Sequence, residues 1–380
     1  MIHFAEKSDT TSTFQHGHTT IAHADTSSGR GCTSLRFFGI VGDREETETS
    51  EYAGQGNTMS ASPYREFHLI EELLQQLPHH RRQGGILKTG AGDDAAALHT
   101  LHSPVVTTDT QREGVHFQRA WLTGRQLGQK AAMVCLSDLA ASYATPQALF
   151  INLCLPENTD QPYLLDLYRG FGDALETYGG VLAGGNISSS RENDLAIDLF
   201  AIGEGYAPMP LRSNARPGEL LCSSGYLGLA RAGLHALMHG HHAPASLLEA
   251  FRAPRARFDA APILHTAEVT TLMDISDGLQ GDSEKIASAS GVSIELHIAQ
   301  EHLHPDLREY ATQHHLDPIA MIAGGGEDYE LLFTCSEQQL KSIRTKLPTV
   351  QVVGRILPRG AQPVTGAAGA SFVHGVDWKP

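Results

Sequence analysis

After about residue 59, apolar runs of two kinds alternate along the chain, and this alternation is the strongest constraint on its fold. Short runs of aliphatic and β-branched residues predict strands, and longer runs with apolar residues every three or four positions predict helices. Strands that alternate with helices indicate an α+β chain with α/β-type layers. The predicted strands are Val105–Thr108, Leu149–Leu155, Leu195–Ile202, Leu220–Ser223, Met273–Ile275, Val292–Ile298, Tyr329–Thr334 and Val350–Ile356. The predicted helices are Gly124–Ser142, Tyr163–Tyr178, Leu227–His239, Gly278–Ser290 and Glu337–Lys346.

The first 58 residues differ in composition from the rest of the chain. They are rich in Ser, Thr, Gly and His and have few periodic apolar positions, which is typical of a disordered tail. A misassigned start codon and a structured binding arm are the alternatives. We therefore expect the folded part to start near Met59.

A helix is predicted directly after this point. Ser62 is placed to cap it, and Pro63 suits its first position. Its apolar face is formed by Phe67, Ile70, Leu73, Leu74 and Leu77. Further along, the turn-rich segment 211–218 predicts a linker. It divides an N-terminal domain, 59–206, from a C-terminal domain, 207–380.

Composition and charge exclude several classes of protein. A chain of 380 residues that is 41% hydrophobic can bury the cores of two domains. It has no apolar run long enough to span a bilayer, and its first ten residues do not resemble a secretory signal. With 43 acidic and 28 basic side chains the net charge is −15, which disfavours nucleic acid and membrane partners. Five scattered cysteines without a CxxC pair predict reduced thiols in the cytoplasm.

Acidic residues recur at turns built from glycine or other small residues. Few basic residues lie near them, so burial would raise their pKa values unless cations neutralise them. Oxygen ligands without His or Cys suit Mg²⁺, which accepts phosphate oxygens as further ligands. The glycines let backbone amides approach phosphates. The motifs are Gly90-Ala-Gly-Asp-Asp94, Thr107-Thr-Asp-Thr110 at a strand end, Leu136-Ser-Asp-Leu-Ala-Ala141, Asp274-Ile-Ser-Asp-Gly278 and Gly324-Gly-Gly-Glu-Asp-Tyr-Glu330.

The sequence has no P-loop and no protein-kinase HRD or DFG motif, so ATP would be bound through another fold. The order of its motifs resembles the thiamine-monophosphate kinases of the aminoimidazole-ribonucleotide-synthetase-like superfamily. The resemblance starts at Arg65–Ile70 and runs through GAGDDAA, TTDTQREGVHF, KAAMVCLSDLAA, LAGGN, LRSNARPGE, DISDGL and GGGEDYELLFT.

This resemblance implies a two-domain PurM-like fold. Its N-terminal mixed-sheet domain would form a barrel with that of a second copy, and its C-terminal domain would be α/β. The implied reaction is transfer of the γ-phosphoryl group of ATP to thiamine monophosphate, which gives thiamine diphosphate. The implied enzyme is a homodimer that uses several Mg²⁺ ions.

The resemblance also assigns roles to individual residues. It implies ATP contacts for Gly185, Arg212 and Ser276, and contacts with thiamine monophosphate for His116 and Glu327. No residue is expected to act as a general base, because a phosphate monoester is already largely ionised, and positioning and charge neutralisation would carry the catalysis. The implied metal ligands are Asp94, Thr107, Thr108, Asp109, Asp138, Asn186, Asp274 and Asp277.

Three positions depart from the family pattern. Asn186 stands where the family has aspartate, and it keeps a carbonyl oxygen but removes a negative charge. Leu229 stands where the family usually has aspartate, and Val376 where it has an aromatic residue. These departures leave two alternatives open. One is an ATP-dependent enzyme of the same superfamily with another acceptor, and the other is a catalytically decayed nucleotide-binding paralogue.

Some of the residues singled out also have ordinary structural explanations. Asp274 or Asp277 could cap the following helix. Arg212 could be a surface arginine and His116 a buried core histidine. Asp282 is expected to support the site or to lie on a helix surface. The pairs His79-His80, His241-His242 and His314-His315 are not expected to bind metal, because adjacent side chains point apart.

Overall fold

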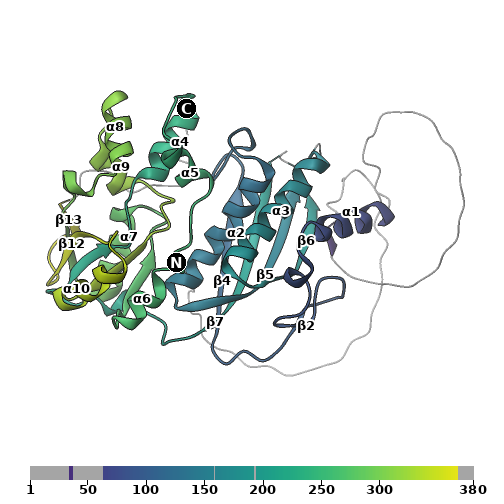
Figure 1. Cartoon of the computed structure of the whole chain (residues 1–380), viewed down its shortest axis with the longest axis horizontal. Helices are drawn as coiled ribbons and strands as arrows, with labels where there is room; N and C mark the ends of the chain where they lie inside the picture. The colour runs from purple at the N-terminus through teal and green to yellow at the C-terminus, as the bar shows by residue number, and fades with distance from the viewer. Residues whose placement is uncertain (1–33, 37–62, 158, 192–193, 367–380) are drawn as a thin grey trace, which may run out of the picture. The chain divides into compact units, whose positions relative to one another are not determined.

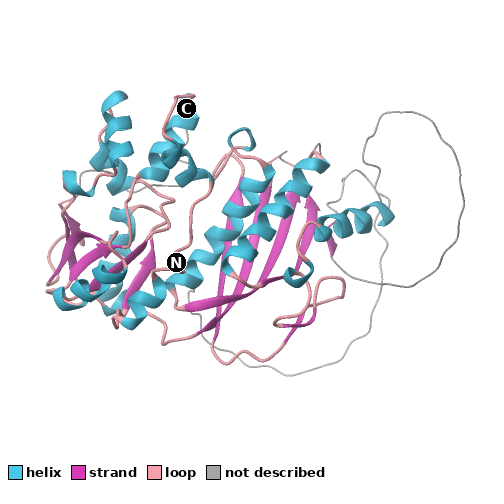
Figure 2. Ribbon diagram, viewed as in Figure 1, coloured by secondary structure: helices cyan, strands magenta, loops and turns pink. Residues whose placement is uncertain are grey.

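The computed structural model describes residues 34–36, 63–157, 159–191 and 194–366 of the chain. Within these residues two mixed β-sheets are each packed against helices (Figures 1 and 2). The strands of the first sheet come before residue 206, and those of the second come after residue 219. None of the described helices is long and apolar enough to cross a membrane.

The first sheet has the order β1-β6-β5-β7-β4. Strands β5 and β6 are parallel and are joined through helix α3, whereas the other neighbours are antiparallel. The strands are β1 (Ser34–Arg36), β4 (Pro104–Arg112), β5 (Ala144–Leu155), β6 (Val181–Ser189) and β7 (Ala196–Gly205), and β2 (Leu87–Thr89) and β3 (Ala97–Leu98) form a separate hairpin.

Helices α2 (Gly124–Ala141) and α3 (Gln161–Tyr178) cover one face of the first sheet (Figure 1). The backbones of α2 and α3 are so close that a Cβ added to Gly128 would lie 2.0 Å from the carbonyl oxygen of Leu167. The predicted helix is present as α1 (Pro63–Gln75), which packs against α3 and contributes Leu73 and Leu74 of its apolar face to the core. The opposite face of the sheet has no helix on it among the described residues, and it exposes Val106 and Phe200.

The second sheet has the order β13-β10-β12-β8-β11-β9 and is covered on both faces. Its strands are β8 (Leu220–Ser223), β9 (Thr271–Asp274), β10 (Ser293–Leu296), β11 (Leu331–Cys335), β12 (Gln351–Leu357) and β13 (Val364–Thr365). Its helices are α4 (Leu229–His239), α5 (Ala245–Arg252), α6 (Ala261–Thr266), α7 (Leu279–Ser290), α8 (Pro305–Gln313), α9 (Pro318–Gly324) and α10 (Glu337–Lys346). Helices α6 and α10 pack on one face, and α4, α7 and α8 contribute to the core on the other.

Two expectations about local structure are wrong. The Thr107–Thr110 motif lies within β4 and not at a strand end, because β4 pairs with β7 from Pro104 to Arg112. The glycine-rich LAGGN segment, which was not predicted as a strand, is the middle of β6. The hydrogen bonds to β5 fix its extended backbone, so glycine does not interrupt the strand.

Strand β1 lies inside the segment 1–58, which the sequence assigns to a tail. Its residues pair antiparallel with β6, with Arg36 opposite Asn186. The rest of that segment, Ser62 and the C-terminal Val376 lie outside the described residues.

Candidate active site

Three aspartates from separate elements meet where the first sheet region contacts β9. Side chains alternate along β4, so Thr107 and Asp109 face helix α2, while Thr108 points to the open face of the sheet. The Thr107 hydroxyl donates a hydrogen bond to Asp138 Oδ2 on α2. Asp274, the last residue of β9, accepts a hydrogen bond of 2.8 Å from the hydroxyl of Ser137. We call Asp109, Asp138 and Asp274 the carboxylate cluster.

Burial makes the cluster electrostatically unfavourable as it stands. It raises the pKa of Asp109 to about 6, and the nearby charges of Asp138 and Glu327 add to this shift. Burial and then the charge of Asp138 raise the pKa of Asp274 to about 7. The pKa of Asp138 is also raised by burial, although Thr107, Arg212 and Lys285 act against the shift. No described Lys or Arg forms an ion pair with any of the three, so a bound cation would relieve this repulsion.

A second set of acidic residues follows Asp274 directly, and a lysine neutralises it. Asp282 is fully buried, and its Oδ2 accepts the backbone N–H groups of Ser276 and Asp277 at 3.0 Å each. Lys285 Nζ lies 2.7 Å from Asp282 Oδ1 and 2.5 Å from Asp277 Oδ2. We call Asp277, Asp282 and Lys285 the Lys285 network. Asp282 is therefore not on a helix surface but fixes the loop after β9.

The Gly324–Glu330 loop brings Glu327 toward the same region. Glu327 is almost fully buried, its backbone φ is +66°, and its N–H donates to the Ser276 carbonyl. Its Oε2 lies 2.8 Å from Nζ of Lys130, a fully buried lysine of α2. Lys130 also donates to the Phe251 carbonyl at 2.9 Å. The other carboxylate oxygen of Glu327, Oε1, is buried without a hydrogen-bond partner.

The residue after Glu327 serves a different purpose. Asp328 Oδ2 accepts the backbone N–H of Gly228 at 2.9 Å, at the N-terminus of α4. Burial raises the pKa of Asp328 to about 8 in spite of this hydrogen bond. The loop thus holds two consecutive acids, of which the buried Glu327 faces α2 and the half-buried Asp328 faces α4.

A pocket of about 640 Å³ opens on the uncovered face of the first sheet. The Gly90–Asp94 turn forms one wall, and Gly185 and Asn186 of β6 lie on its floor. A Cβ on Gly185 would lie 1.9 Å from the Ile151 carbonyl oxygen, so only glycine fits there. The Oδ1 atom of Asn186 is buried without a hydrogen-bond partner. The remaining lining residues are Ala95, Ala96, Phe150, Asn152, Ala183, Gly184, Phe200 and Ile202.

The remaining predicted site residues lie near the carboxylate cluster or near the pocket. Arg212 is exposed in the short turn Arg212–Asn214, close enough to lower the pKa values of Asp138 and Asp274. Ser276 lies in the loop that Asp282 holds. His116 is half-buried just beyond β4, and its Nδ1 accepts the Arg112 N–H at 3.1 Å. Asp94 and Thr108 are exposed on the pocket side of the first sheet region.

The donor set fits Mg²⁺ bound jointly by protein and phosphate. No three His, Cys, Asp or Glu side chains of the described chain are arranged to hold a metal ion by themselves. Mg²⁺ commonly takes only one or two carboxylates and completes its shell with water and phosphate oxygens. The unpartnered Asn186 Oδ1 and the raised pKa values of the carboxylate cluster both favour such a cation.

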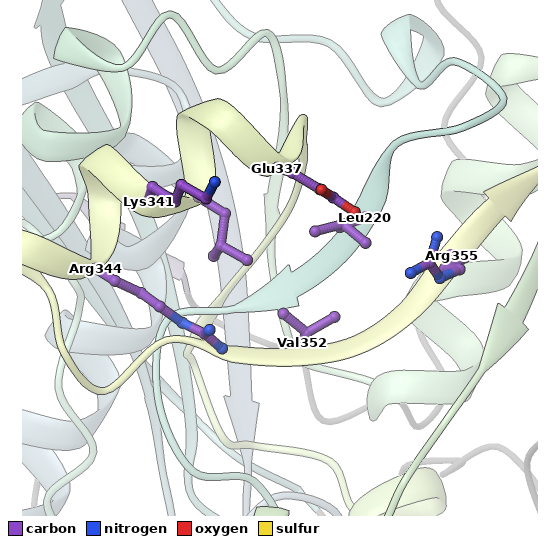
Figure 3. A pocket seen from close by; sticks show the side chains of 7 residues that line it. Leu220, Glu337, Lys341, Arg344, Val352 and Arg355 are labelled. Atoms are coloured by element: carbon purple, nitrogen blue, oxygen red, sulfur yellow. The ribbon is translucent and has the colours of Figure 1, made fainter.

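A second, smaller pocket of about 300 Å³ contains no predicted site residue. It lies between α10 and the β8–β12 strand pair, where Lys341, Arg344 and Arg355 surround Leu220 and Val352 (Figure 3). All three basic side chains are exposed.

Comparison with known proteins agrees with this fold. The family described as "AIR synthase related protein, N-terminal domain" matches residues 92–204, which assigns the first sheet region to that class of protein. The thiamine-monophosphate kinase of Aquifex aeolicus is 36% identical over 249 residues, 64% of this chain and 79% of that protein. The thiamine-monophosphate kinase of Pyrococcus horikoshii is 30% identical over 292 residues, 77% of this chain and 88% of that protein.

A solved structure described as AaThiL complexed with AMPPCP and TMP superposes with a TM-score of 0.62 at 30% identity. The match covers 81% of this chain and 92% of that one. The chain belongs to the thiamine-monophosphate kinase family. The expected family and its two-domain PurM-like class of fold are thereby confirmed.

Sequence reasoning missed two features of the site. Lys130 is a lone charge on a helix face whose neighbours Leu127 and Val134 are buried, and this position was a signal that it needs a buried partner. Asn152 and Asp198 lie in register beside Asn186 and extend its polar row across the open face. Polar residues inside otherwise apolar strands could have indicated that face.

Proposed function

We propose that this chain transfers the γ-phosphoryl group of ATP to thiamine monophosphate. The observation that carries this proposal is the carboxylate cluster, in which the buried Asp274 and the half-buried Asp109 and Asp138 have raised pKa values and no ion-pair partner among the described residues, in a chain of this family. Asp109, Asp138 and Asp274 would hold Mg²⁺ on the α2 side of the first sheet, and Asp94 and Asn186 would hold a separate Mg²⁺ in the pocket on its open face. Bound there, Mg²⁺ would neutralise the charge of the phosphates.

The chain's own residues would bind and orient the two substrates. Gly185 would contact ATP from β6, and Arg212 and Ser276 would contact it from the second sheet region. His116 and Glu327 would contact thiamine monophosphate. The Ser276–Gly278 loop, which Asp282 fixes, would keep Ser276 in place.

The reaction needs no general base from the protein. An oxygen of the acceptor phosphate is already ionised near neutral pH and would form a bond to the γ-phosphorus. The bond between that phosphorus and the β–γ bridging oxygen would break, and ADP would leave. Alignment and charge neutralisation would provide the rate enhancement.

The finer parts of the proposal concern the assembly and its location. A second copy would cover the open face of the first sheet, where Val106 is 53% and Phe200 38% exposed. Residues 59–206 and 207–380 would be the two domains. None of the described cysteines forms a disulfide, and these are Cys135, Cys154, Cys222 and Cys335. The Sγ atoms of Cys222 and Cys335 lie 3.8 Å apart. Free thiols are typical of the reducing cytoplasm, where we place this protein.

The test is thiamine diphosphate formation by the full chain with ATP, Mg²⁺ and thiamine monophosphate. The Asn186→Asp variant, which restores the family's charge, is assayed beside it. Product from the wild type supports the proposed acceptor, and product from the variant alone identifies a decayed enzyme. If neither forms product while both bind ATP, the acceptor is a different one. Assays of ADP release with a panel of acceptors would then identify the true acceptor. The departure from the family pattern at Asn186 favours this alternative.

A further inference from the structure

Four histidines gather at one end of the second sheet region, away from the carboxylate cluster. His235 and His239 lie one turn apart on α4, His241 follows that helix, and His314 caps the end of α8. The ring centroids of His235 and His239 are 4.4 Å apart, and those of His241 and His314 are 4.2 Å apart. His235 lies 5.6 Å from His241. We call these four residues the imidazole cluster.

A tyrosine of α8 orients two of these rings. The Tyr310 hydroxyl lies 2.9 Å from Nδ1 of His235 and 3.4 Å from Nδ1 of His241. If each Nδ1–H donates to this oxygen, the lone pair of each Nε2 stays free for another ligand. Metal-binding histidines are commonly held in this way by a hydrogen bond from the ring nitrogen that does not touch the metal. The Nε2 of His314 is also buried without a hydrogen-bond partner.

The ligand atoms of the imidazole cluster are nitrogens, and this determines which metal ions it would bind. Neutral imidazole nitrogen is a borderline ligand that favours Zn²⁺, Ni²⁺ or Cu²⁺ over Mg²⁺. The cluster is therefore chemically distinct from the oxygen ligands of the carboxylate cluster.

We propose that His235, His239, His241 and His314 form a binding site for a borderline divalent transition metal such as Zn²⁺. As the described side chains lie, no three donor atoms converge on one point, and the rings of His241 and His314 stack with an interplanar angle of 9°. Binding thus requires side-chain rotation. His239 and His241 are exposed, so little packing opposes it. A metal bound there would join the end of α4 to the end of α8.

The chain offers matched controls beside two of the ligands. His242 follows His241 and His315 follows His314, and neither takes part in the cluster's ring contacts. Zn²⁺ binding to the full chain is measured by calorimetry, with excess Mg²⁺ present to occupy the carboxylate cluster. We expect one tight site per chain, weakened by about tenfold or more in His235→Ala and His314→Ala. His242→Ala and His315→Ala should leave the affinity within about twofold of wild type.

Two further measurements keep the test decisive if a variant of the partly buried His235 or His314 unfolds. The exposed His239→Ala and His241→Ala variants should weaken binding without loss of the native circular dichroism spectrum. Co²⁺ bound to the wild type should show the intense visible absorption of a tetrahedral site with nitrogen ligands. Affinity that falls equally in the control variants, or that no cluster variant changes, would overturn the proposal. Neither readout depends on kinase activity, so its outcome is separate from that of the proposed function.

Discussion

Asp274 and Asp282 are both buried and lie eight residues apart, but their hydrogen-bond and ion-pair partners differ. Asp282 accepts two backbone N–H groups and pairs with Lys285. Asp274 has one hydroxyl donor, faces Asp138, and has its pKa raised to about 7. The chain thus neutralises one carboxylate with its own lysine and leaves the other without a cation. This difference separates a residue that shapes the site from one that would bind a metal.

The largest effect is expected from replacing Asp274. Asp274→Asn removes one charge that would hold Mg²⁺ near the phosphates, so kcat should fall by roughly two to three orders of magnitude. Steady-state kinetics at saturating ATP would measure the loss. The free energy of unfolding without Mg²⁺ should not fall, because a repulsive buried charge is lost. A variant that stays active and is strongly destabilised would assign Asp274 the structural part that we give to Asp282.

Asp282 should show the reverse pattern, with stability affected first. Asp282→Ala leaves two loop amides and Lys285 without their acceptor, and should lower the free energy of unfolding by about 2–4 kcal/mol. The partial exposure of Lys285 places the ion-pair contribution at the low end. Urea denaturation monitored by circular dichroism would give the value. Unchanged stability would mean that the Lys285 network does not hold the loop.

The pH dependence of stability should isolate the contribution of Asp274. Because the pKa of Asp274 is raised from its usual 3.8 to about 7, the folded chain binds more protons than the unfolded chain between these pH values. Without Mg²⁺ the Asp274 contribution therefore destabilises the fold increasingly as the pH rises from about 4 to about 7. The difference in unfolding free energy between wild type and Asp274→Asn isolates this contribution. A difference that is constant across the window would contradict it.

The smallest effect on stability is expected at Asp277, the other acid of the Lys285 network. Its side chain is about one-third exposed and pairs with Lys285, so Asp277→Asn should cost less than about 1 kcal/mol of stability. The Michaelis constant for ATP decides its role. An unchanged Michaelis constant contradicts metal binding by Asp277, and an increase of tenfold or more supports its predicted role as a metal ligand.

The sequence predicted regular elements well wherever apolar periodicity decided them. Strand β8 and helix α10 have the predicted limits, since the apolar runs there end at turn residues. It failed at β6, where glycines hid a strand that depends on hydrogen bonds to β5. It also gave Thr107, Thr108 and Asp109 one shared role, although strand alternation puts Thr108 on the opposite face.

For the candidate site, the sequence indicated the acidic residues but not the basic side chains that pair with them. The pairing of Lys285 with Asp282 follows from helical spacing, because residues three apart share a face of α7. The pairing of Lys130 with Glu327 crosses from α2 to a distant loop, and no local pattern reports it. The imidazole cluster was missed for the same reason, because His314 reaches it from another helix.

The Lys130–Glu327 pair also has a consequence for the biosynthesis of the chain. The two residues are 197 positions apart, so a ribosome finishes the first sheet region long before Glu327 is translated. Until then α2 carries an ammonium group whose burial lacks its counter-charge. We therefore expect nascent chains that end before residue 327 to keep α2 hydrated and open to chaperones, and the last step of folding to wait for the C-terminal part of the chain.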